Sequence, residues 1–215
     1  MIKAVLFDFD GTFMNTRDAI LNGWRYIFDE VKGITVSEKE LATIFRVPMN
    51  QTLKKYFPEM PVEESMEIYK DYQIKNPQKR VPFKGMPDLV RKCYEEGYKI
   101  GLVTSRQLAS STMGLKKSGV FDCFSSLVTA ETCENHKPSK DPIVAALNDL
   151  HVAPGEAVMI GDSISDLESG KNAEVPVILV GWTQDIDLKN PPEHCLPYAI
   201  CHTPEEIFKT VKNMK

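Results

Sequence analysis

The sequence contains no apolar run that approaches the ~18–20 residues needed to cross a bilayer. Apolar stretches such as residues 4–7 and 177–180 have the length of β-strands. The apolar start of the chain is interrupted at Asp8, which is earlier than in a secretory signal. We therefore expect no contact with a membrane, and a cytoplasmic location.

The sequence also lacks an excess of basic residues. It carries 26 Lys and Arg against 30 Asp and Glu, which gives a net charge of −4 and a pI near 5.7. Binding to a nucleic-acid backbone depends on clustered Lys and Arg, and the sequence contains no evident basic cluster. Nucleic acid is therefore not an expected partner.

Cysteine is scarce, with five residues at irregular spacing. An odd number without paired spacing favours free thiols in a reducing compartment. The tightest group is His194-Cys195 followed by Cys201-His202, and it does not match the paired Cys and His spacings of zinc sites. We expect these four residues to be ordinary structural residues.

The chain is nevertheless rich enough in apolar residues, at 42%, to fold into one or two domains. Residues 2–9 have the pattern of a buried strand, and residues 16–76 carry only helical signals, which predict about four helices. From residue 98 onward, strand and helix signals alternate. Strands are predicted at 98–104, 126–129, 157–160 and 177–180, with helices at 87–96, 108–118, 141–150 and 165–172.

Alternation of strands and helices predicts the fold class α/β, with a Rossmann-like parallel sheet and helices on both faces. A small all-α domain is inserted after the first strand. The expected boundaries are residues 1–14 and 82–215 for the α/β core and residues 15–81 for the helical domain. Ligands of such sheets bind beyond the carboxyl ends of the strands, so residues that follow each strand are the candidates for function.

Two carboxylates, Asp8 and Asp10, end the first strand and are followed by Gly11. Unpaired carboxylates are costly to bury, so this pair predicts a neutralising cation. Gly11 permits a sharp turn and a close approach of the backbone to a ligand. The simpler alternative is a strand cap with an acidic turn.

Each of the later strands contributes a further candidate. Thr104 and Ser105 lie at the end of the second strand and suit an anion. Lys137 precedes a helix, and Asp162 and Asp166 follow the fourth strand. Each one alone has an ordinary explanation as a helix cap or a solvated lysine. Together, Asp8, Asp10 and Asp162 predict Mg²⁺ with an anion beside it at Thr104 and Lys137, which indicates phosphoryl transfer.

With these motifs in order, the sequence resembles the haloacid dehalogenase (HAD) superfamily over nearly its whole length. The matching motifs are Asp8-Phe9-Asp10-Gly11-Thr12, Thr104-Ser105, Lys137-Pro138 and Gly161-Asp162-Ser163-Ile164-Ser165-Asp166. The subgroup is similar to phosphoglycolate phosphatase and β-phosphoglucomutase, whose helical cap follows the first strand.

The resemblance implies a catalytic role for several of these residues. Asp8 would attack phosphorus to form an aspartyl-phosphate, and Asp10 would protonate the leaving oxygen and later activate water. Thr104 and the Ser105 amide would hold the phosphoryl oxygens. Lys137 would offset the negative charge of Asp8 and the phosphate.

The resemblance also implies a metal site. Mg²⁺ would be held by the Asp8 carboxylate, the Asp10 backbone carbonyl and Asp162. Asp166 would lie in or beside the layer of residues that contact the metal ligands and hold them in place. The Gly11-Thr12 segment would shape the loop and orient Asp10.

Substrate choice in this superfamily belongs to the helical cap. Arg46 falls where related caps carry a loop that faces the substrate, and it is a candidate contact for an anion. Ile20 stands near the position of a histidine in the mutase branch, which disfavours a mutase. Asn15 and Gly181-Trp182-Thr183 resemble a pyrophosphatase-like branch.

The expected function is therefore a Mg²⁺-dependent phosphatase that hydrolyses a small phosphorylated metabolite through an aspartyl-phosphate, in the manner of phosphoglycolate phosphatase. The alternatives are an inorganic pyrophosphatase of the same family and a β-phosphoglucomutase-like phosphomutase. A non-catalytic binding protein is disfavoured because the motif residues are intact. We expect a monomer or a weak homodimer.

Overall fold

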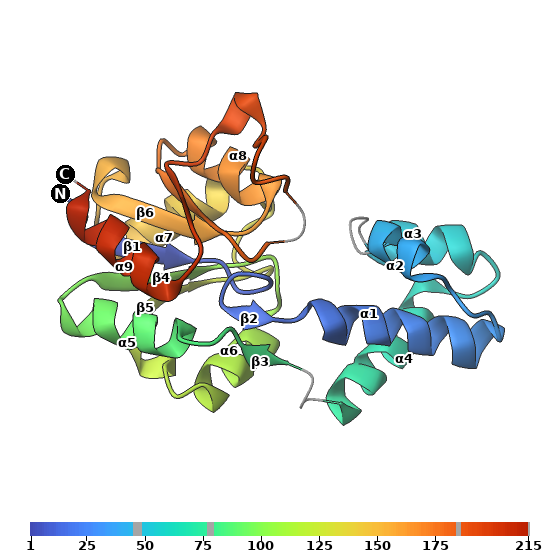
Figure 1. Cartoon of the computed structure of the whole chain (residues 1–215). Coiled ribbons are helices and arrows are strands. Elements are labelled where there is room, and N and C mark those ends of the chain that lie inside the picture. Colours follow the sequence, from blue (N-terminus) through green and yellow to red (C-terminus); the bar gives the residue numbers. More distant parts are fainter. Residues whose placement is uncertain (45–48, 77–79, 184–185, 215) are drawn as a thin grey trace. The chain divides into compact units, whose positions relative to one another are not determined.

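The computed structural model describes residues 1–44, 49–76, 80–183 and 186–214 (Figure 1). The chain divides into two compact units. One consists of Met1–Asn15 together with Pro82–Lys215, and the other of Thr16–Val81. We call them the core unit and the helical unit and describe each by itself.

The core unit is built on a six-stranded sheet with the order β5-β4-β1-β6-β7-β8. Every neighbouring pair of strands in it is parallel. The strands are β1 (Ala4–Phe7), β4 (Lys99–Val103), β5 (Phe124–Val128), β6 (Ala157–Gly161), β7 (Val177–Val180) and β8 (Ala199–Cys201). Because β1 lies between β4 and β6, the loops that leave these three strands meet at one edge of the sheet.

Helices cover both faces of this sheet (Figure 1). Side chains alternate along β1, so that Val5 and Phe7 enter one apolar cluster while Ala4 and Leu6 enter the other. The first cluster includes residues of α5 (Met86–Glu95), α6 (Leu108–Lys117) and α9 (Pro204–Asn213). The second includes residues of α7 (Asp141–Leu150) and α8 (Ile164–Asn172). A strand buried on both faces must be apolar throughout, which explains the unbroken run in β1.

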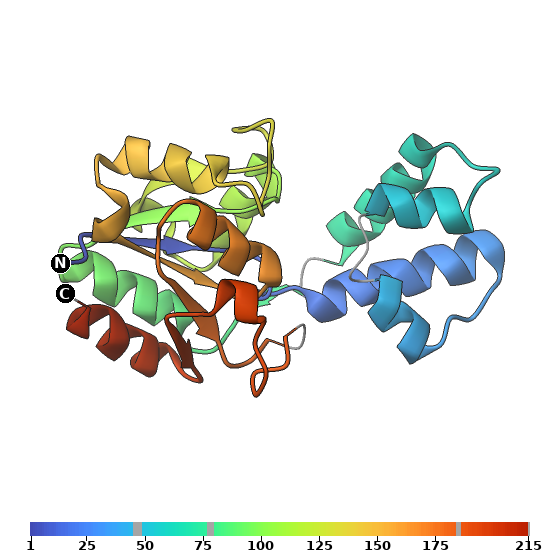
Figure 2. The same ribbon diagram turned by 90° about the horizontal axis from the view of Figure 1, so that it is seen from above.

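The helical unit contains α1 (Arg17–Tyr26), which continues into a π-helix (Ile27–Lys32), and then α2 (Glu38–Ile44), α3 (Met49–Tyr56) and α4 (Val62–Lys75) (Figure 2). Its apolar centre is aromatic. The ring of Phe28 lies 5.1 Å from Phe57, and the ring of Trp24 lies 5.9 Å from Tyr69. These contacts join the π-helix to the residue that follows α3, and α1 to α4, and they hold the helical unit together.

The expected fold class is confirmed, since the chain forms a parallel α/β sheet with helices on both faces. Strand β8 and helix α9 were not predicted. The apolar signal of β8, Ala199–Cys201, is only three residues long, whereas Ile207, Phe208 and Val211 of α9 do recur at helical spacing. The short strands β2 (Met14–Asn15) and β3 (Val81–Pro82) form a separate two-stranded sheet. No helix among the described residues is long and apolar enough to cross a membrane.

Candidate active site

Three carboxylates gather at the carboxyl ends of the central strands. Asp8 follows β1, Asp162 follows β6, and Asp166 lies in the first turn of α8. One oxygen from each lies within 4.8 Å of the others, and all three residues are buried. The parallel arrangement of β1 and β6, with Phe7 beside Ile160, brings the first two residues together.

Lys137 joins this group from the segment that precedes α7. Its ammonium Nζ donates hydrogen bonds to Asp8 Oδ1 and Asp166 Oδ1, each at 2.6 Å, and to the carbonyl oxygen of Val103 at 3.1 Å. The exposed fractions of these three charged side chains are 6% for Lys137, 8% for Asp8 and 1% for Asp166. One buried cation is therefore shared by two carboxylates.

The electrostatic balance of this group is negative. Burial raises the pKa of Asp8 to about 7, with Asp166 and Asp10 adding to the rise and Lys137 opposing it. Burial also raises the pKa of Asp162 well above its usual value, and the charges of Asp8 and Asp166 act in the same direction. A second positive charge bound here would favour the ionised form of both groups. The donor set, made of carboxylate oxygens, suits a hard divalent cation such as Mg²⁺.

Lys137 remains charged in these surroundings. Burial by itself would lower the pKa of its ammonium group, but attraction by Asp166 and Asp8 outweighs burial and raises that pKa. A permanently protonated lysine can neutralise a carboxylate or a phosphoryl oxygen, but it cannot serve as a base near neutral pH.

The turn after β1 is shaped by its contact with Asp162. Gly11 has φ +83°, and a Cβ at this position would lie 2.2 Å from Asp162 Oδ2. The hydroxyl of Thr12 donates a hydrogen bond to Asp162 Oδ1 at 3.2 Å. The glycine is therefore required both by the backbone conformation and by the carboxylate that packs against it.

Asp166 is held by the start of its own helix. Its Oδ2 accepts hydrogen bonds from the Ser163 hydroxyl at 2.6 Å and from the backbone N–H groups of Asp162 and Ser163 at 3.2 and 3.1 Å. Ser163 caps α8 in return, by accepting from the Asp166 N–H. One oxygen of Asp166 thus stabilises the loop while the other binds Lys137.

The side chain of Asp10 makes a different contact from those of the other three aspartates. Arg106 donates from Nε to Asp10 Oδ2 at 2.8 Å and from its terminal nitrogen Nη2 to Asp10 Oδ1 at 2.7 Å. Arg106 was not among the residues predicted for the site. The signal that was available is its place directly after Thr104-Ser105, on the loop that leaves β4.

The other phosphate-binding candidates lie on the same loop. Thr104 is buried, and its Oγ1 accepts a hydrogen bond from the backbone N–H of Arg106 at 3.1 Å. Ser105 is exposed. Arg46, the candidate substrate contact, lies outside the described residues. The structure therefore brings together, from the predicted set, Asp8, Asp162, Asp166 and Lys137, with Gly11 and Thr12 packed against Asp162.

The loop after β7 donates hydrogen bonds to the backbone of the loops that follow β1 and β6. The hydroxyl of Thr183 donates to the carbonyl oxygen of Asp162 at 2.7 Å, and the indole N–H of Trp182 donates to the carbonyl oxygen of Gly11 at 3.1 Å. The Trp182 ring also packs on Phe83, with ring centres 5.4 Å apart. Gly181-Trp182-Thr183 was expected only to resemble one branch of the family, and these backbone contacts were not predicted.

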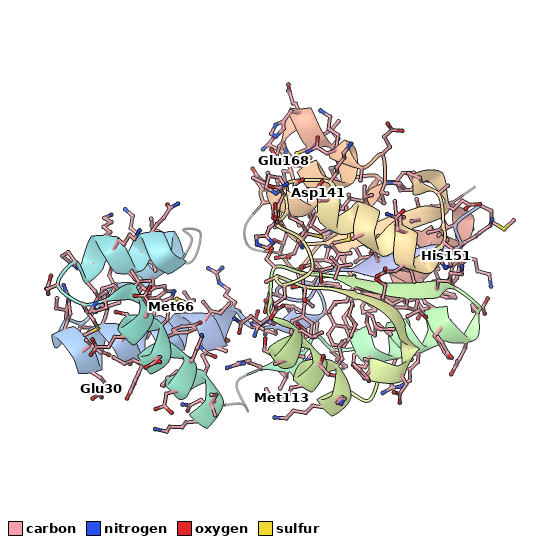
Figure 3. All side chains as sticks on the ribbon, turned by 180° about the vertical axis from the view of Figure 1, so that it is seen from behind. Glu30, Met66, Met113, Asp141, His151 and Glu168 are labelled. Atoms are coloured by element: carbon pink, nitrogen blue, oxygen red, sulfur yellow. The ribbon has the colours of Figure 1, made fainter. Side chains whose placement is uncertain are left out.

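The cysteines are not part of this group. All five are free thiols. Cys195 lies near His194 and Glu168, the last of which is labelled on α8 in Figure 3, and His194 Nε2 is 2.9 Å from Glu168 Oε1. Cys201 instead lies 3.4 Å from the hydroxyl of Thr210. Within the described ranges, no group of three metal-ligand side chains contains Cys201 or His202.

The fold and the site define a class of protein: a parallel α/β protein whose strand ends carry buried carboxylates, a shared lysine and a candidate anion-binding loop. The sequence pattern of the haloacid dehalogenase-like hydrolases matches residues 5–180. The chain therefore belongs to the haloacid dehalogenase-like hydrolase family, as the motifs predicted.

A similar relative supports this assignment, and solved structures share the fold. The pyrophosphatase PpaX of Halalkalibacterium halodurans is 31% identical over 182 residues, which cover 84% of each chain. A structure from Haemophilus somnus, described as a predicted phosphoglycolate phosphatase, superposes with a TM-score of 0.81 at 17% identity and covers 97% of each chain. The haloacid dehalogenase-like protein SP0104 of Streptococcus pneumoniae superposes with a TM-score of 0.82 at 20% identity, over 97% of this chain and 98% of that one.

Proposed function

We propose that the protein is a Mg²⁺-dependent phosphatase that acts through an aspartyl-phosphate, and that its substrate is inorganic pyrophosphate. The observation that carries the chemistry is the buried set of Asp8, Asp162 and Asp166 around the Lys137 ammonium group. The support for pyrophosphate is the similarity to a relative named as a pyrophosphatase over 84% of the chain.

In the first half of the reaction, a carboxylate oxygen of Asp8 forms a bond to phosphorus. The bond between phosphorus and the leaving oxygen breaks, and its electron pair stays on that oxygen, which Asp10 can protonate. Lys137, 2.6 Å from Asp8 Oδ1, offsets the negative charge that Asp8 and the phosphoryl group share. Thr104 and the Ser105 N–H hold the phosphoryl oxygens.

In the second half, Asp10 removes a proton from a water molecule, whose oxygen attacks phosphorus. The bond between phosphorus and the Asp8 oxygen breaks, and the Asp8 carboxylate is restored as phosphate leaves. The same residue thus supplies a proton in one step and takes one in the next.

Asp8, Asp162 and the backbone of Asp10 would hold Mg²⁺, with Asp166 beside them. The excess of buried negative charge, which raises the pKa of both Asp8 and Asp162, fits a bound divalent cation. When bound, Mg²⁺ supplies positive charge that stabilises the phosphoryl oxygens during transfer.

A small phosphomonoester is the second candidate substrate. The presence of Asp10 is compatible with an ester, because an alcohol leaving as an alkoxide needs a proton, and it argues against dehalogenation, because a halide does not. A phosphomutase is disfavoured by Ile20, which is an apolar residue packed against the centre of the helical unit.

The test is a phosphate-release assay over pyrophosphate and a panel of phosphomonoesters, with Mg²⁺ present. The proposal expects turnover of pyrophosphate above that of every monoester, and loss of turnover by at least about 10³-fold in Asp8→Asn. Circular dichroism of the variant should match the wild type. Full activity in Asp8→Asn would exclude the covalent route. A sugar phosphate that is isomerised, in the presence of a bisphosphate, faster than phosphate is released would instead identify a mutase.

A further inference from the structure

Arg106 lies where the phosphate-binding loop meets Asp10. Its guanidinium group makes two parallel hydrogen bonds to the Asp10 carboxylate, at 2.7 and 2.8 Å, and its carbon Cζ lies 5.5 Å from the centre of the Phe9 ring. The exposed fractions of the Arg106 and Asp10 side chains are 16% and 33%, so an incoming anion can reach them. The backbone N–H of Arg106 also bonds to Thr104, which ties the arginine to the loop that holds the transferred phosphoryl group.

The paired state of Asp10 has a consequence for the leaving group. Because both oxygens of Asp10 accept hydrogen bonds from the guanidinium group of Arg106, neither can meet a leaving oxygen or a water molecule until this ion pair opens. The alcohol of an alkyl ester leaves as an alkoxide, which needs a proton from an accessible acid such as Asp10. The leaving group of pyrophosphate is a phosphate, which spreads its negative charge over several oxygens. Its departure depends less on a proton than on a nearby cation.

Lys137 is poorly placed to supply that cation to the leaving group. It is buried, and its ammonium group already binds Asp8 and Asp166. Arg106 is bonded to the carboxylate that would face the leaving oxygen, and a guanidinium group binds two phosphate oxygens as well as it binds two carboxylate oxygens.

We propose that Arg106 is a specificity-determining residue that binds the second, leaving phosphate group of a phosphoanhydride. The inference rests on the proposed function, because it assigns a substrate class to the same site. When pyrophosphate enters, its leaving phosphate takes over the guanidinium group of Arg106 and releases Asp10 to act first on the leaving oxygen and then on water. A monoalkyl phosphate has no second anion to make this exchange, so Arg106 keeps Asp10 paired and disfavours the ester.

The kinetic test compares pyrophosphate with ethyl phosphate in Arg106→Gln and Arg106→Lys. For Arg106→Gln we expect kcat/KM for pyrophosphate to fall by about 10- to 100-fold, the effect of losing a charged hydrogen-bonding partner. The value for ethyl phosphate should stay within about threefold of wild type or rise. Arg106→Lys keeps the charge but lacks the two parallel donors of a guanidinium group. Its kcat/KM for pyrophosphate should lie between the values of wild type and Arg106→Gln.

The matched control is Arg91→Gln. Arg91 also forms an ion pair with an aspartate, Asp88, at 2.8 Å, but that pair lies on the exposed side of α5. We expect this control to leave both substrates unchanged. An equal loss for pyrophosphate and ethyl phosphate in Arg106→Gln would overturn the proposal, because it would mean that Arg106 only positions Asp10.

A binding measurement separates this inference from the proposed function. Methylenediphosphonate, which cannot be hydrolysed, and orthophosphate are titrated by calorimetry into wild type and Arg106→Gln in the presence of Mg²⁺. We expect the variant to bind the diphosphonate at least about tenfold more weakly and orthophosphate equally well. Equal affinity of both proteins for the diphosphonate would overturn the role of Arg106. Absence of pyrophosphate hydrolysis by wild type would overturn the proposed function. The binding of methylenediphosphonate would still decide whether Arg106 binds a second phosphate group.

Discussion

The indole nitrogen of Trp182 lies 3.1 Å from the carbonyl oxygen of Gly11 and donates a hydrogen bond to it, although the two residues are 171 positions apart. The next residue, Thr183, does the same for the carbonyl oxygen of Asp162 at 2.7 Å. The loop after β7 thus holds the backbone of the loops that follow β1 and β6. Contacts of this kind keep carboxylates in place for a cation without binding it themselves.

The first prediction concerns Thr183. Thr183→Val keeps the shape of the side chain but removes the hydrogen bond to Asp162, which loosens the backbone that carries this carboxylate. We expect the Mg²⁺ concentration for half-maximal activity to rise about tenfold, while kcat at saturating Mg²⁺ stays within about threefold. Thr210→Val, which alters a hydroxyl next to Cys201, is the control and should leave the Mg²⁺ titration unchanged. An unaltered titration in Thr183→Val would contradict a positioning role.

The second prediction uses two glycines with nearly the same backbone conformation. Gly11 has φ +83° and Gly97 has φ +88°, so alanine is strained at both. Only at Gly11 would the new Cβ meet Asp162, whereas nothing lies within 4 Å at Gly97. We expect Gly97→Ala to cost about 1 kcal/mol of unfolding free energy with activity retained, and Gly11→Ala to lose activity by at least about 100-fold. Chemical denaturation and phosphate release measure the two effects, and equal activities of the variants would refute the assigned contact.

The third prediction concerns the stability of the metal-free protein. The folded state raises the pKa of Asp162 above its unfolded value, so folding favours the protonated form of this group. Its contribution to stability is therefore lost as pH rises from the unfolded pKa through the folded one, and the charged group opposes folding above both. We expect Asp162→Asn to stabilise the metal-free protein at pH 8 by on the order of 1 kcal/mol, seen as a Tm about 2–4 °C higher.

The same comparison at pH 5 should give a smaller gain, because part of Asp162 is then protonated in the folded protein. Asp187→Asn is the control, since Asp187 is exposed on a loop and bonds to Asn190. It should show no such gain at pH 8. A destabilised Asp162→Asn at pH 8 without metal would mean that burial does not dominate the electrostatics of this group.

The fourth prediction concerns removal of the metal. Three buried carboxylates with one shared lysine leave negative charge that the phosphoryl group of a substrate would increase. Treatment with a chelator should therefore lower phosphate release by at least about 100-fold, and Mg²⁺ added in excess over the chelator should restore it. Turnover that persists in the chelated protein would rule out the assignment of the carboxylates to a cation site.

The sequence by itself determined the architecture of the core unit and most of the candidate site. Apolar runs such as Ala4–Phe7, buried on both sides, are stable only inside a parallel sheet covered by helices, so their order along the chain sets the fold class. Parallel strands end at one edge, which is why residues as distant in sequence as Asp8 and Asp162 were expected to meet. The three-residue strand Ala199–Cys201 has too short an apolar signal to be recognised in this way.

The family resemblance placed Lys137 beside Asp8, but only the tertiary structure decided the other partners of the charged groups. Lys137 binds Asp8 and Asp166 and not Asp10, and Asp10 pairs with Arg106, which lies 96 positions away. These choices depend on distances of a few ångströms between loops and on how deeply each side chain is buried. Because the energy of an ion pair changes steeply with both, a sequence pattern can place the groups at one edge of the sheet but cannot assign their partners.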